Sequence, residues 1–472
     1  MKKTFLLTLL LFAQHLSAQK FDMAGSWLGS LDFSGRTMDI LITFEQTEGK
    51  LTGNLSSEKQ QLKDIGISNI QLSLPNLKFD IPLAGGKWTG TVNQKEGRLE
   101  GNWIQGPYKA TLNLVKQQVK PQLRIKDRSQ TPQAPFPYDI EEVSFINQRD
   151  ETILAGTLTL PKGTGPFPAA ILLTVAGPND RDQSHGSPQH KPFLVLADHL
   201  TRQGFAVLRA DDRGIGGSTG DLFQSTIEDF AHDALAGFEL LKQHQRIDPE
   251  QIGFIGNSEG TLVGPMAAAI NKETAFIVTL GGMGIPGAEV ILDQVRAIGQ
   301  LGGLDETEVA KLRAHSQELF GVIRNELDSK KVAQKLRILL ENSEKPDMDE
   351  RLFLVPKSIE EQIKIFSSPW YRYQVDFDPA PFLQSITCPF LALHGSQDPF
   401  VAPDKNLAAI AAHLRKAGNQ QYATMLLPGL NHVFQDATSG SPLLYNENEI
   451  SFSPRALTLI SSWLKVSLKM KP

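Results

Sequence analysis

Apolar and polar residues alternate from about residue 22 to residue 116. The clearest run places Met38, Ile40, Ile42 and Phe44 at every second position, and similar runs recur up to Leu114. Such alternation is typical of antiparallel strands that are buried on one face only. The pattern predicts an antiparallel all-β domain over residues 19–116, with a meander of about eight strands packed as a sandwich or a small closed barrel.

The pattern changes from about residue 138 onward, where short apolar runs alternate with segments of helical character. This alternation is typical of parallel strands joined by crossover helices, so it predicts an α/β domain over residues 138–472. The six apolar runs that we predict as strands are 170–175, 206–210, 252–255, 276–280, 390–393 and 423–427.

Residues of about 284–378 interrupt this order. A helix start is indicated at Asp305–Glu308, and the apolar residues that follow it, from Val309 to Ile323, fall mostly on one helical face. An excursion of this length between two sheet strands predicts a helical lid or cap.

The segment 117–137 loses all periodicity and gathers glutamine, proline and basic residues. Proline favours extended geometry, so we predict a linker between the two domains. Its lysine and arginine side chains are expected to face solvent.

The first eighteen residues have a separate pattern. A basic head, Met1–Lys3, precedes a short apolar run to Ala13, and the stretch ends on the small residue Ala18. This order predicts a signal peptide over residues 1–18, and the apolar run is too short to span a bilayer. No cysteine follows directly after the predicted cleavage site at Ala18, so we expect no lipid anchor and no stable membrane anchor. The expectation is a soluble exported protein, periplasmic or secreted.

Composition removes several classes of function. Lys and Arg number 47 against 52 Asp and Glu, a net charge of −5, so no global basic field exists to hold nucleic acid. A single cysteine, Cys388, cannot form an intrachain disulfide. The histidines follow no metal-ligand spacing, so we predict no metal site.

The strongest chemical motif is the pentapeptide Gly256-Asn257-Ser258-Glu259-Gly260, which lies between a predicted strand and an alanine-rich helical run. A serine on such a tight turn is exposed as a nucleophile, and the flanking positions, Gly256 and Gly260, must be small because side chains there would collide. We therefore predict a nucleophile elbow with Ser258 as the nucleophile.

A nucleophilic serine needs a base, and the base needs an orienting carboxylate. Asp398 and His432 each follow an apolar strand, where side chains gather at the carboxyl edge of a parallel sheet. Read singly, Asp398 could be a turn former and His432 structural. Their order and positions together predict a catalytic set of Ser258, Asp398 and His432.

An oxyanion needs backbone N–H donors. The N–H of Glu259, at the start of the predicted helix, is one candidate. The second is expected from the loop after an earlier strand, where Pro178 has no N–H. The candidates there are the N–H groups of Ala176 and Gly177.

Several segments together resemble a known family. GPNDRD, GNSEG, GSQD and GLNH, with the stretch KPFLVLADHLTRQGFAVLRADDRGIGGSTG, are similar to bacterial α/β-hydrolases of the carboxylesterase and serine-aminopeptidase-like group. Most similar are esterases that carry GPNDRD after the first central strand, often behind an N-terminal β-domain. The resemblance covers about residues 138–472. It implies an eight-stranded, mostly parallel sheet, hydrolysis of small-molecule carboxylic esters without a cofactor, and the roles of nucleophile, acid and base for Ser258, Asp398 and His432.

Three functions stay open on the sequence. The first is a serine esterase. The second is a serine aminopeptidase, in which the carboxylate of Glu259 would meet a substrate's free amine. The third is an inactive ligand-binding protein, against which the intact set of Ser258, Asp398 and His432 argues. Aromatic residues where the lid rejoins the core either line an acyl pocket or pack the lid: Trp370, Tyr371 and Tyr373. The oligomeric state is not indicated.

Overall fold

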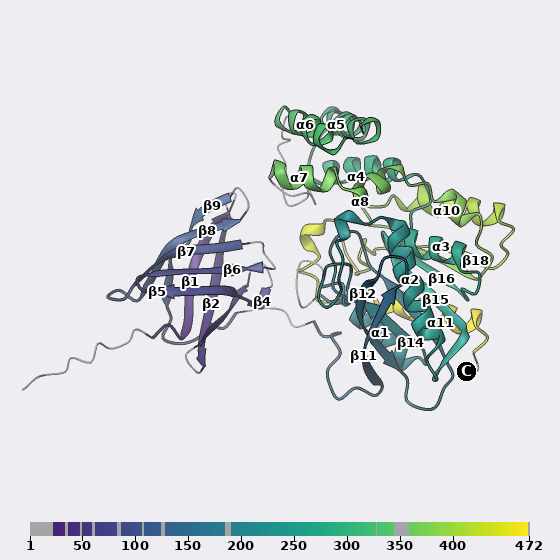
Figure 1. Cartoon of the computed structure of the whole chain (residues 1–472), viewed down its shortest axis with the longest axis horizontal. Coiled ribbons are helices and arrows are strands. Elements are labelled where there is room, and N and C mark those ends of the chain that lie inside the picture. The colour runs from purple at the N-terminus through teal and green to yellow at the C-terminus, as the bar shows by residue number, and fades with distance from the viewer. Residues whose placement is uncertain are drawn as a thin grey trace, which may run out of the picture. The chain divides into compact units, whose positions relative to one another are not determined.

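The computed structural model describes residues 22–470 apart from 34–35, 48–49, 59–61, 83–85, 106–107, 124–127, 185–189, 327 and 344–357. The predicted signal peptide, residues 1–18, lies outside the described residues. The chain forms two compact units, one made up mainly of the residues up to Leu123 and the other mainly of those from Arg124 onward (Figure 1).

The N-terminal unit is an antiparallel sheet, which confirms the predicted all-β domain. Its strands follow the order β4-β3-β2-β1-β10-β8-β7-β6-β5, with β9 paired to β8. The strands are β1 (Gly25–Phe33), β2 (Arg36–Thr47), β3 (Lys50–Ser57), β4 (Leu62–Gly66), β5 (Ser68–Ser73), β6 (Asn76–Ile81), β7 (Gly86–Asn93), β8 (Arg98–Gln105), β9 (Tyr108–Thr111) and β10 (Leu114–Lys116). There are ten described strands where about eight were expected, and the last alternating run, which ends at Leu114, is divided between the short strands β9 and β10.

Large aromatic side chains form the core of this unit. Trp27, Phe44, Phe79 and Trp88 are almost completely buried. The rings of Phe79 and Trp88 stack with centroids 5.3 Å apart, and the Trp88 indole N–H donates to the Leu112 carbonyl at 2.9 Å. A buried indole needs such an acceptor, and Trp27 has one in the Met23 carbonyl at 3.0 Å.

The C-terminal unit contains an eight-stranded sheet in the order β11-β12-β14-β13-β15-β16-β17-β18. The strands from β14 to β18 are parallel, whereas β11 and β12 pair antiparallel with each other and β12 with β14. The strands are β11 (Asp139–Asn147), β12 (Thr152–Leu160), β13 (Phe167–Leu173), β14 (Ala206–Ala210), β15 (Ile247–Asn257), β16 (Ile277–Leu280), β17 (Phe390–Gly395) and β18 (Tyr422–Leu427).

Helices cover both faces of this sheet. On one face, α1 (Pro192–Arg202) and α11 (Pro454–Ser467) bury a core with Phe205, Phe434 and Phe452. On the other face, α2 (Ile227–Lys242) and α3 (Gly260–Ile270) pack on the sheet around a core that includes Phe238 of α2 and Phe254 of β15. The helices α9 (Ala380–Leu383) and α10 (Pro403–Lys416) extend that layer, and two short 3₁₀ turns are η2 (Leu222–Gln224) and η4 (Pro442–Leu444). The result is a three-layer α/β/α unit, in which polar side chains meet at the carboxyl edge of the parallel strands.

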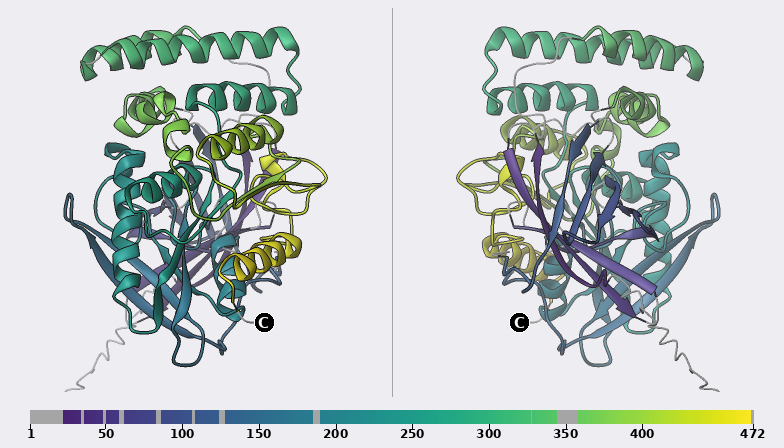
Figure 2. Two further views of the ribbon diagram at one scale, coloured as in Figure 1. Left: turned by 90° about the vertical axis from the view of Figure 1, so that its right-hand side faces the viewer. Right: turned by 90° about the vertical axis from the view of Figure 1, so that its left-hand side faces the viewer.

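The lid region is helical, as expected. Its helices are α4 (Gly287–Leu301), α5 (Glu306–Asn325), α6 (Ser329–Glu341), α7 (Ile359–Phe366) and α8 (Pro369–Asp376). Figure 2 shows α5 and α6 as an outer layer above α4, α7 and α8. The Asp305 carboxylate and Glu308 form the capping box that starts α5, and Phe320, Ile323 and Leu336 belong to a core of the lid's own.

Among the described residues, no helix combines the length and the apolar composition that crossing a membrane requires.

The stretch that we predict as a linker contains a side chain that is not solvated. Arg128 is buried, and its guanidinium donates to the Tyr445, Asn446 and Ile450 carbonyls at 3.2–3.4 Å and to that of Asn448. Burial lowers the pKa of Arg128 to about 10. The expectation that the basic residues of this stretch face solvent is therefore wrong for Arg128, because the loop after β18 presents several carbonyls that need donors.

Candidate active site

Ser258 lies on the turn from β15 into α3. Its φ angle is +50°, a left-handed conformation that a non-glycine residue rarely adopts. The Ser258 backbone N–H donates to the Leu280 carbonyl at 2.9 Å, which ties the turn to the end of β16. The strain is therefore held by neighbouring strands.

The two glycines of the pentapeptide are required by space. A Cβ atom at Gly256 would lie 2.2 Å from the Gly260 carbonyl oxygen, and one at Gly260 would lie 2.3 Å from the Leu173 carbonyl oxygen. Neither distance is possible for a real side chain. The tight strand-to-helix turn and its close approach to β13 thus depend on glycine at both positions.

Asp398 and His432 are brought together across two loops. Asp398 follows β17 and His432 follows β18, and the Nδ1 atom of His432 lies 2.7 Å from Oδ2 of Asp398. The other carboxylate oxygen accepts the backbone N–H groups of Phe400 at 2.8 Å and Val401 at 3.0 Å. The carboxylate is fixed on both sides, and it leaves Nε2 of the imidazole available for another partner.

The environment of Asp398 favours its charged form. Burial acts to raise the pKa, but the facing His432 imidazole, with smaller contributions from His394 and the Val401 N–H, outweighs it and holds the pKa of Asp398 below its usual value. An ionised carboxylate beside Nδ1 stabilises an imidazolium on the other side of the bond.

Gly281 was not singled out from the sequence. It follows Leu280, whose carbonyl holds the Ser258 amide, and a Cβ atom at Gly281 would lie 3.3 Å from both the Asp398 carboxylate and the His432 ring. The end of β16 therefore lies against the Ser258 turn on one side and the Asp398–His432 pair on the other. The sequence feature that could have identified this position is the pair Gly281-Gly282 directly after an apolar strand.

The conformation of this glycine turn is held by His394. Its Nε2 atom lies 2.9 Å from the Gly282 carbonyl, and burial lowers the pKa of His394 to about 4, so the ring is neutral.

Among the described residues, no group of His, Cys, Asp or Glu side chains is arranged to hold a metal ion.

The candidate oxyanion donors lie around the Ser258 turn. Glu259 immediately precedes α3, and the Gly260 N–H donates to the Thr174 carbonyl at 2.9 Å, which places the start of the 174–179 loop beside the turn. Within the described part of the chain, the N–H groups of Glu259, Ala176 and Gly177 donate to no other residue. Unpaired donors next to the serine are what an oxyanion site needs.

The side chain of Glu259 is buried under the lid. One of its oxygens accepts the Trp370 indole N–H at 2.8 Å and also the Gln374 amide, both from α8. Burial, with a smaller contribution from Asp212, raises the pKa of Glu259 to about 7. Glu259 is thus an acceptor for the lid helix, a contact that the sequence did not reveal.

The three aromatic residues of α8 point to different surroundings. Trp370 reaches Glu259, Tyr371 packs against Phe366 within the lid core, and Tyr373 packs against Phe377. The structure brings the rings of Trp370 and Tyr371 within 6.4 Å of each other, whereas Tyr373 packs with Phe377, so the three do not form one wall.

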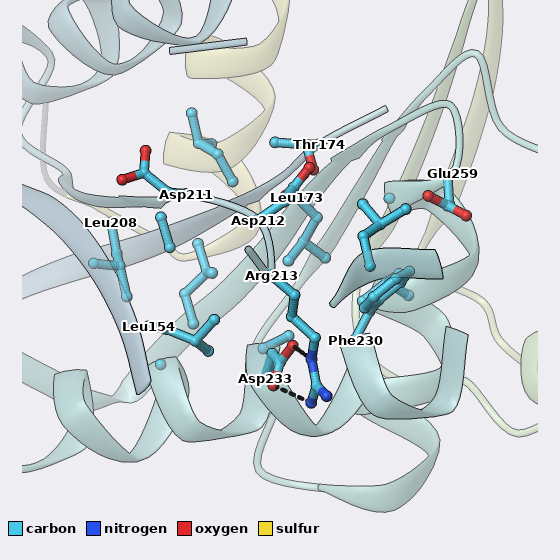
Figure 3. Close-up of a pocket in the computed structure, with 18 of the residues that line it drawn as sticks. Leu154, Leu173, Thr174, Leu208, Asp211, Asp212, Arg213, Phe230, Asp233 and Glu259 are labelled. Carbon is cyan, nitrogen blue, oxygen red and sulfur yellow. Dashed lines mark hydrogen bonds and ion pairs between the residues drawn. The ribbon is translucent and has the colours of Figure 1, made fainter. Parts of the chain in front are cut away.

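A cavity of about 80 Å³ lies beside the turn, between the sheet and α2 (Figure 3). Part of its lining is apolar, with Leu154, Leu208 and Phe230. Thr174, Asp212 and Glu259 line it near the turn, and Arg213 is paired with Asp233 at 2.6 Å at its far side. The cavity therefore joins an apolar interior to the polar groups behind Ser258.

Comparison with known proteins gives the family. A model of the alpha/beta hydrolase fold matches residues 171–436, more than half of the chain. The esterase EstD of Thermotoga maritima is 24% identical over 460 residues, which cover 96% of this chain and 94% of that protein. The resemblance predicted from the sequence is confirmed by these two findings.

Solved structures of similar fold include the alpha/beta hydrolase GrgF from Penicillium sp. sh18, at 16% identity and a TM-score of 0.46 over 70% of this chain and 100% of that chain. Another is the esterase Pf2001 of Pyrococcus furiosus, at 17% identity and a TM-score of 0.43 over 70% of this chain and 92% of that chain. These two likenesses concern the fold alone. With the family match over residues 171–436, the chain belongs to the alpha/beta hydrolase fold family.

Proposed function

We propose that this protein hydrolyses small-molecule carboxylic esters with Ser258 as nucleophile, His432 as general base and Asp398 as the orienting acid. Family membership and the esterase relative support a hydrolase of the carboxylesterase type. The single observation that carries the finer proposal is the 2.7 Å contact between His432 Nδ1 and Asp398 Oδ2, at the sheet edge that also carries the strained Ser258 turn.

The proposed chemistry is acyl transfer to water. His432 takes the Ser258 hydroxyl proton as the oxygen attacks the ester carbonyl, and Asp398 stabilises the imidazolium. The same proton then goes to the departing alcohol, which leaves an acyl-serine. Water then attacks the acyl group as His432 takes its proton, and His432 gives that proton to the Ser258 oxygen as the carboxylic acid leaves. Backbone N–H groups of Glu259 and of the 174–179 loop stabilise the oxyanion in both steps.

The aminopeptidase alternative rested on the charge of Glu259. That carboxyl is buried, its pKa is raised to about 7, and its partners Trp370 and Gln374 are neutral donors of the chain itself. These features support a structural acceptor and give no support to an anchor for a substrate's amine.

The test compares nitrophenyl esters of increasing acyl length with aminoacyl nitroanilides. We expect ester turnover, and a loss of about 10³-fold or more in kcat for Ser258→Ala. Ser461→Ala is the matched control, because Ser461 is a similarly buried serine on α11 that contacts His199. An acyl adduct mapped to Ser258 by mass spectrometry would support the mechanism. Anilide turnover without ester turnover, or full activity of Ser258→Ala, would refute it.

A further inference from the structure

The loop after β13 contains two candidate donors for the oxyanion, the N–H groups of Ala176 and Gly177. Ala176 is exposed, and Gly177 has a φ angle of +95° with open space around its Cα. Both N–H groups lack a partner among the described residues, so hydrogen bonding alone does not separate them.

Asn179 distinguishes them through the carbonyl groups of the same loop. Its side-chain amide donates to the Val175 carbonyl at 2.7 Å and to the Gly177 carbonyl at 2.7 Å. Asn179 is buried, so both carbonyls are turned toward the interior of the unit.

Because a peptide unit is planar, the contact between Asn179 and the Val175 carbonyl also sets the direction of the Ala176 N–H. In a trans peptide the carbonyl and the N–H of the next residue point in opposite directions. The inward Val175 carbonyl therefore turns the Ala176 N–H away from Asn179, toward the exposed side of the loop. The inward Gly177 carbonyl belongs to the peptide of Pro178, which has no N–H. Asn179 therefore fixes the direction of the Ala176 N–H, whereas the Gly177 N–H belongs to the peptide of the Ala176 carbonyl, to which Asn179 does not donate.

Asp212, at the end of β14, fixes Asn179 in turn. Its Oδ2 accepts the Asn179 backbone N–H at 2.9 Å and the side-chain amide at 3.1 Å, and its own N–H donates to the Asn179 carbonyl at 3.1 Å. Its Oδ1 accepts the Thr174 hydroxyl at 2.6 Å, and Figure 3 shows these two side chains pointing toward each other. Both ends of the loop are thus anchored on one buried carboxyl group.

We propose that Asn179 and Asp212 are positioning residues that aim the Ala176 N–H at the oxyanion as its second backbone donor. The inference rests on the proposed ester hydrolysis at Ser258 and deepens it. A donor that acts on the transition state affects kcat more than KM. Loss of one complete oxyanion donor costs about 10²–10³ in kcat, so a misaimed donor should cost about 10- to 100-fold.

The main test is Asn179→Ala against Asn419→Ala. Asn419 is the matched control, because it is equally buried and its side chain also donates to two backbone carbonyls, those of Ile386 and Cys388, far from the turn. We expect kcat to fall about 10- to 100-fold in Asn179→Ala with KM within about threefold, and to stay near wild type in Asn419→Ala.

A second measurement reports the oxyanion directly. A trifluoromethyl ketone labelled with ¹³C at its carbonyl should form a hemiketal with Ser258, whose oxyanion pKa is read from the chemical shift across pH. The hemiketal pKa should rise by about one unit or more in Asn179→Ala, as a tenfold loss of oxyanion stabilisation requires, and should not change in Asn419→Ala. A general loss of stability would not move this pKa.

Thr174 keeps the inference testable if Asn179→Ala does not fold. Thr174→Val removes the hydroxyl that binds Asp212, whereas Thr174→Ser keeps it, so kcat should fall in the first and recover in the second. Equal kcat and hemiketal pKa in wild type, Asn179→Ala and Thr174→Val would overturn the inference while leaving the proposed function intact. Absence of ester turnover and of the adduct in wild type would overturn both.

Discussion

The two sides of the Ser258 turn treat buried carboxyl groups in opposite ways. On the His432 side, the pKa of Asp398 is held below its usual value. On the lid side, burial raises the pKa of Glu259 and of Asp212 to about 7 each. All three carboxyl groups are removed from water, so burial alone does not decide their charge.

The difference lies in the partners. Asp398 faces an imidazole that becomes cationic when it is protonated, whereas Glu259 accepts from an indole and an amide, and Asp212 from a hydroxyl and an asparagine. Neutral donors orient a carboxyl group but compensate less for its lost hydration. The carboxyl group on the His432 side is therefore held in its charged form, whereas the two on the lid side serve to position the groups that donate to them.

The largest effect is expected on the charged side. Asp398→Asn should lower kcat by about 10³–10⁴-fold, because an amide neither fixes the imidazole tautomer nor stabilises the imidazolium. Initial ester-hydrolysis rates at saturating substrate measure it. Asp436→Asn is the control, since Asp436 lies in the same loop as His432 but binds Arg455 and Ser453. A loss of kcat below tenfold in Asp398→Asn would contradict the idea that the charge of Asp398 sets it apart from Glu259 and Asp212.

An intermediate effect is expected on the lid side, in stability. The pKa of Glu259 is about 7 in the folded state, above its ordinary value of 4.5, so the folded state keeps this proton to higher pH than the unfolded state does. The free energy of unfolding therefore falls as pH rises from about 4.5 to 7, by about 3 kcal/mol for this group. Glu259→Gln should remove that part of the decrease.

Urea unfolding at pH 5 and pH 8 checks this, followed by circular dichroism at 222 nm, because the described α-helices all lie in the C-terminal unit. Glu360→Gln is the control, an exposed glutamate whose partner Arg337 lowers its pKa. An unchanged pH dependence in Glu259→Gln would mean that Glu259 is charged at neutral pH, like Asp398.

The smallest effect is expected from the lid contact itself. Trp370→Phe removes the indole N–H that donates to Glu259 and keeps most of the ring, so stability should fall by about 1–2 kcal/mol. Hydrogen exchange of the α8 amides should rise in parallel. Trp463→Phe on α11 controls for the loss of indole area, and an equal change in both variants would contradict the assigned contact.

The sequence predicted the elements whose signal is local. All six predicted strands of the α/β region overlap strands of the sheet, and Ser258, Asp398 and His432 all lie where strands end at its carboxyl edge. The hairpin of β11 and β12 was not predicted from its residues. Apolar and polar residue types alternate only weakly over Asp139–Asn147, and most of Thr152–Leu160 is buried on both sides of the strand. Its assignment depends on pairing with β14, which is remote in sequence.

The contacts around the site depend on tertiary approach. Asn179 and Asp212 are separated by 33 positions, and Glu259 meets Trp370 across 111 positions, so no local pattern indicates either pair. Helical spacing does not separate the aromatic residues of α8 either. Trp370 and Tyr373 are three positions apart and therefore neighbours on the helix surface, yet Trp370 contacts Glu259 and Tyr373 packs against Phe377.

The buried Arg128 guanidinium changes where the chain can be cut. A fragment that starts at residue 138, at the first strand of the sheet, would leave four carbonyls in the segment after His432 without this donor, those of Tyr445, Asn446, Asn448 and Ile450. The predicted linker therefore connects the two units and also stabilises the loop after β18 through Arg128. An excised hydrolase unit that keeps its native C-terminal loop has to begin upstream of Arg128.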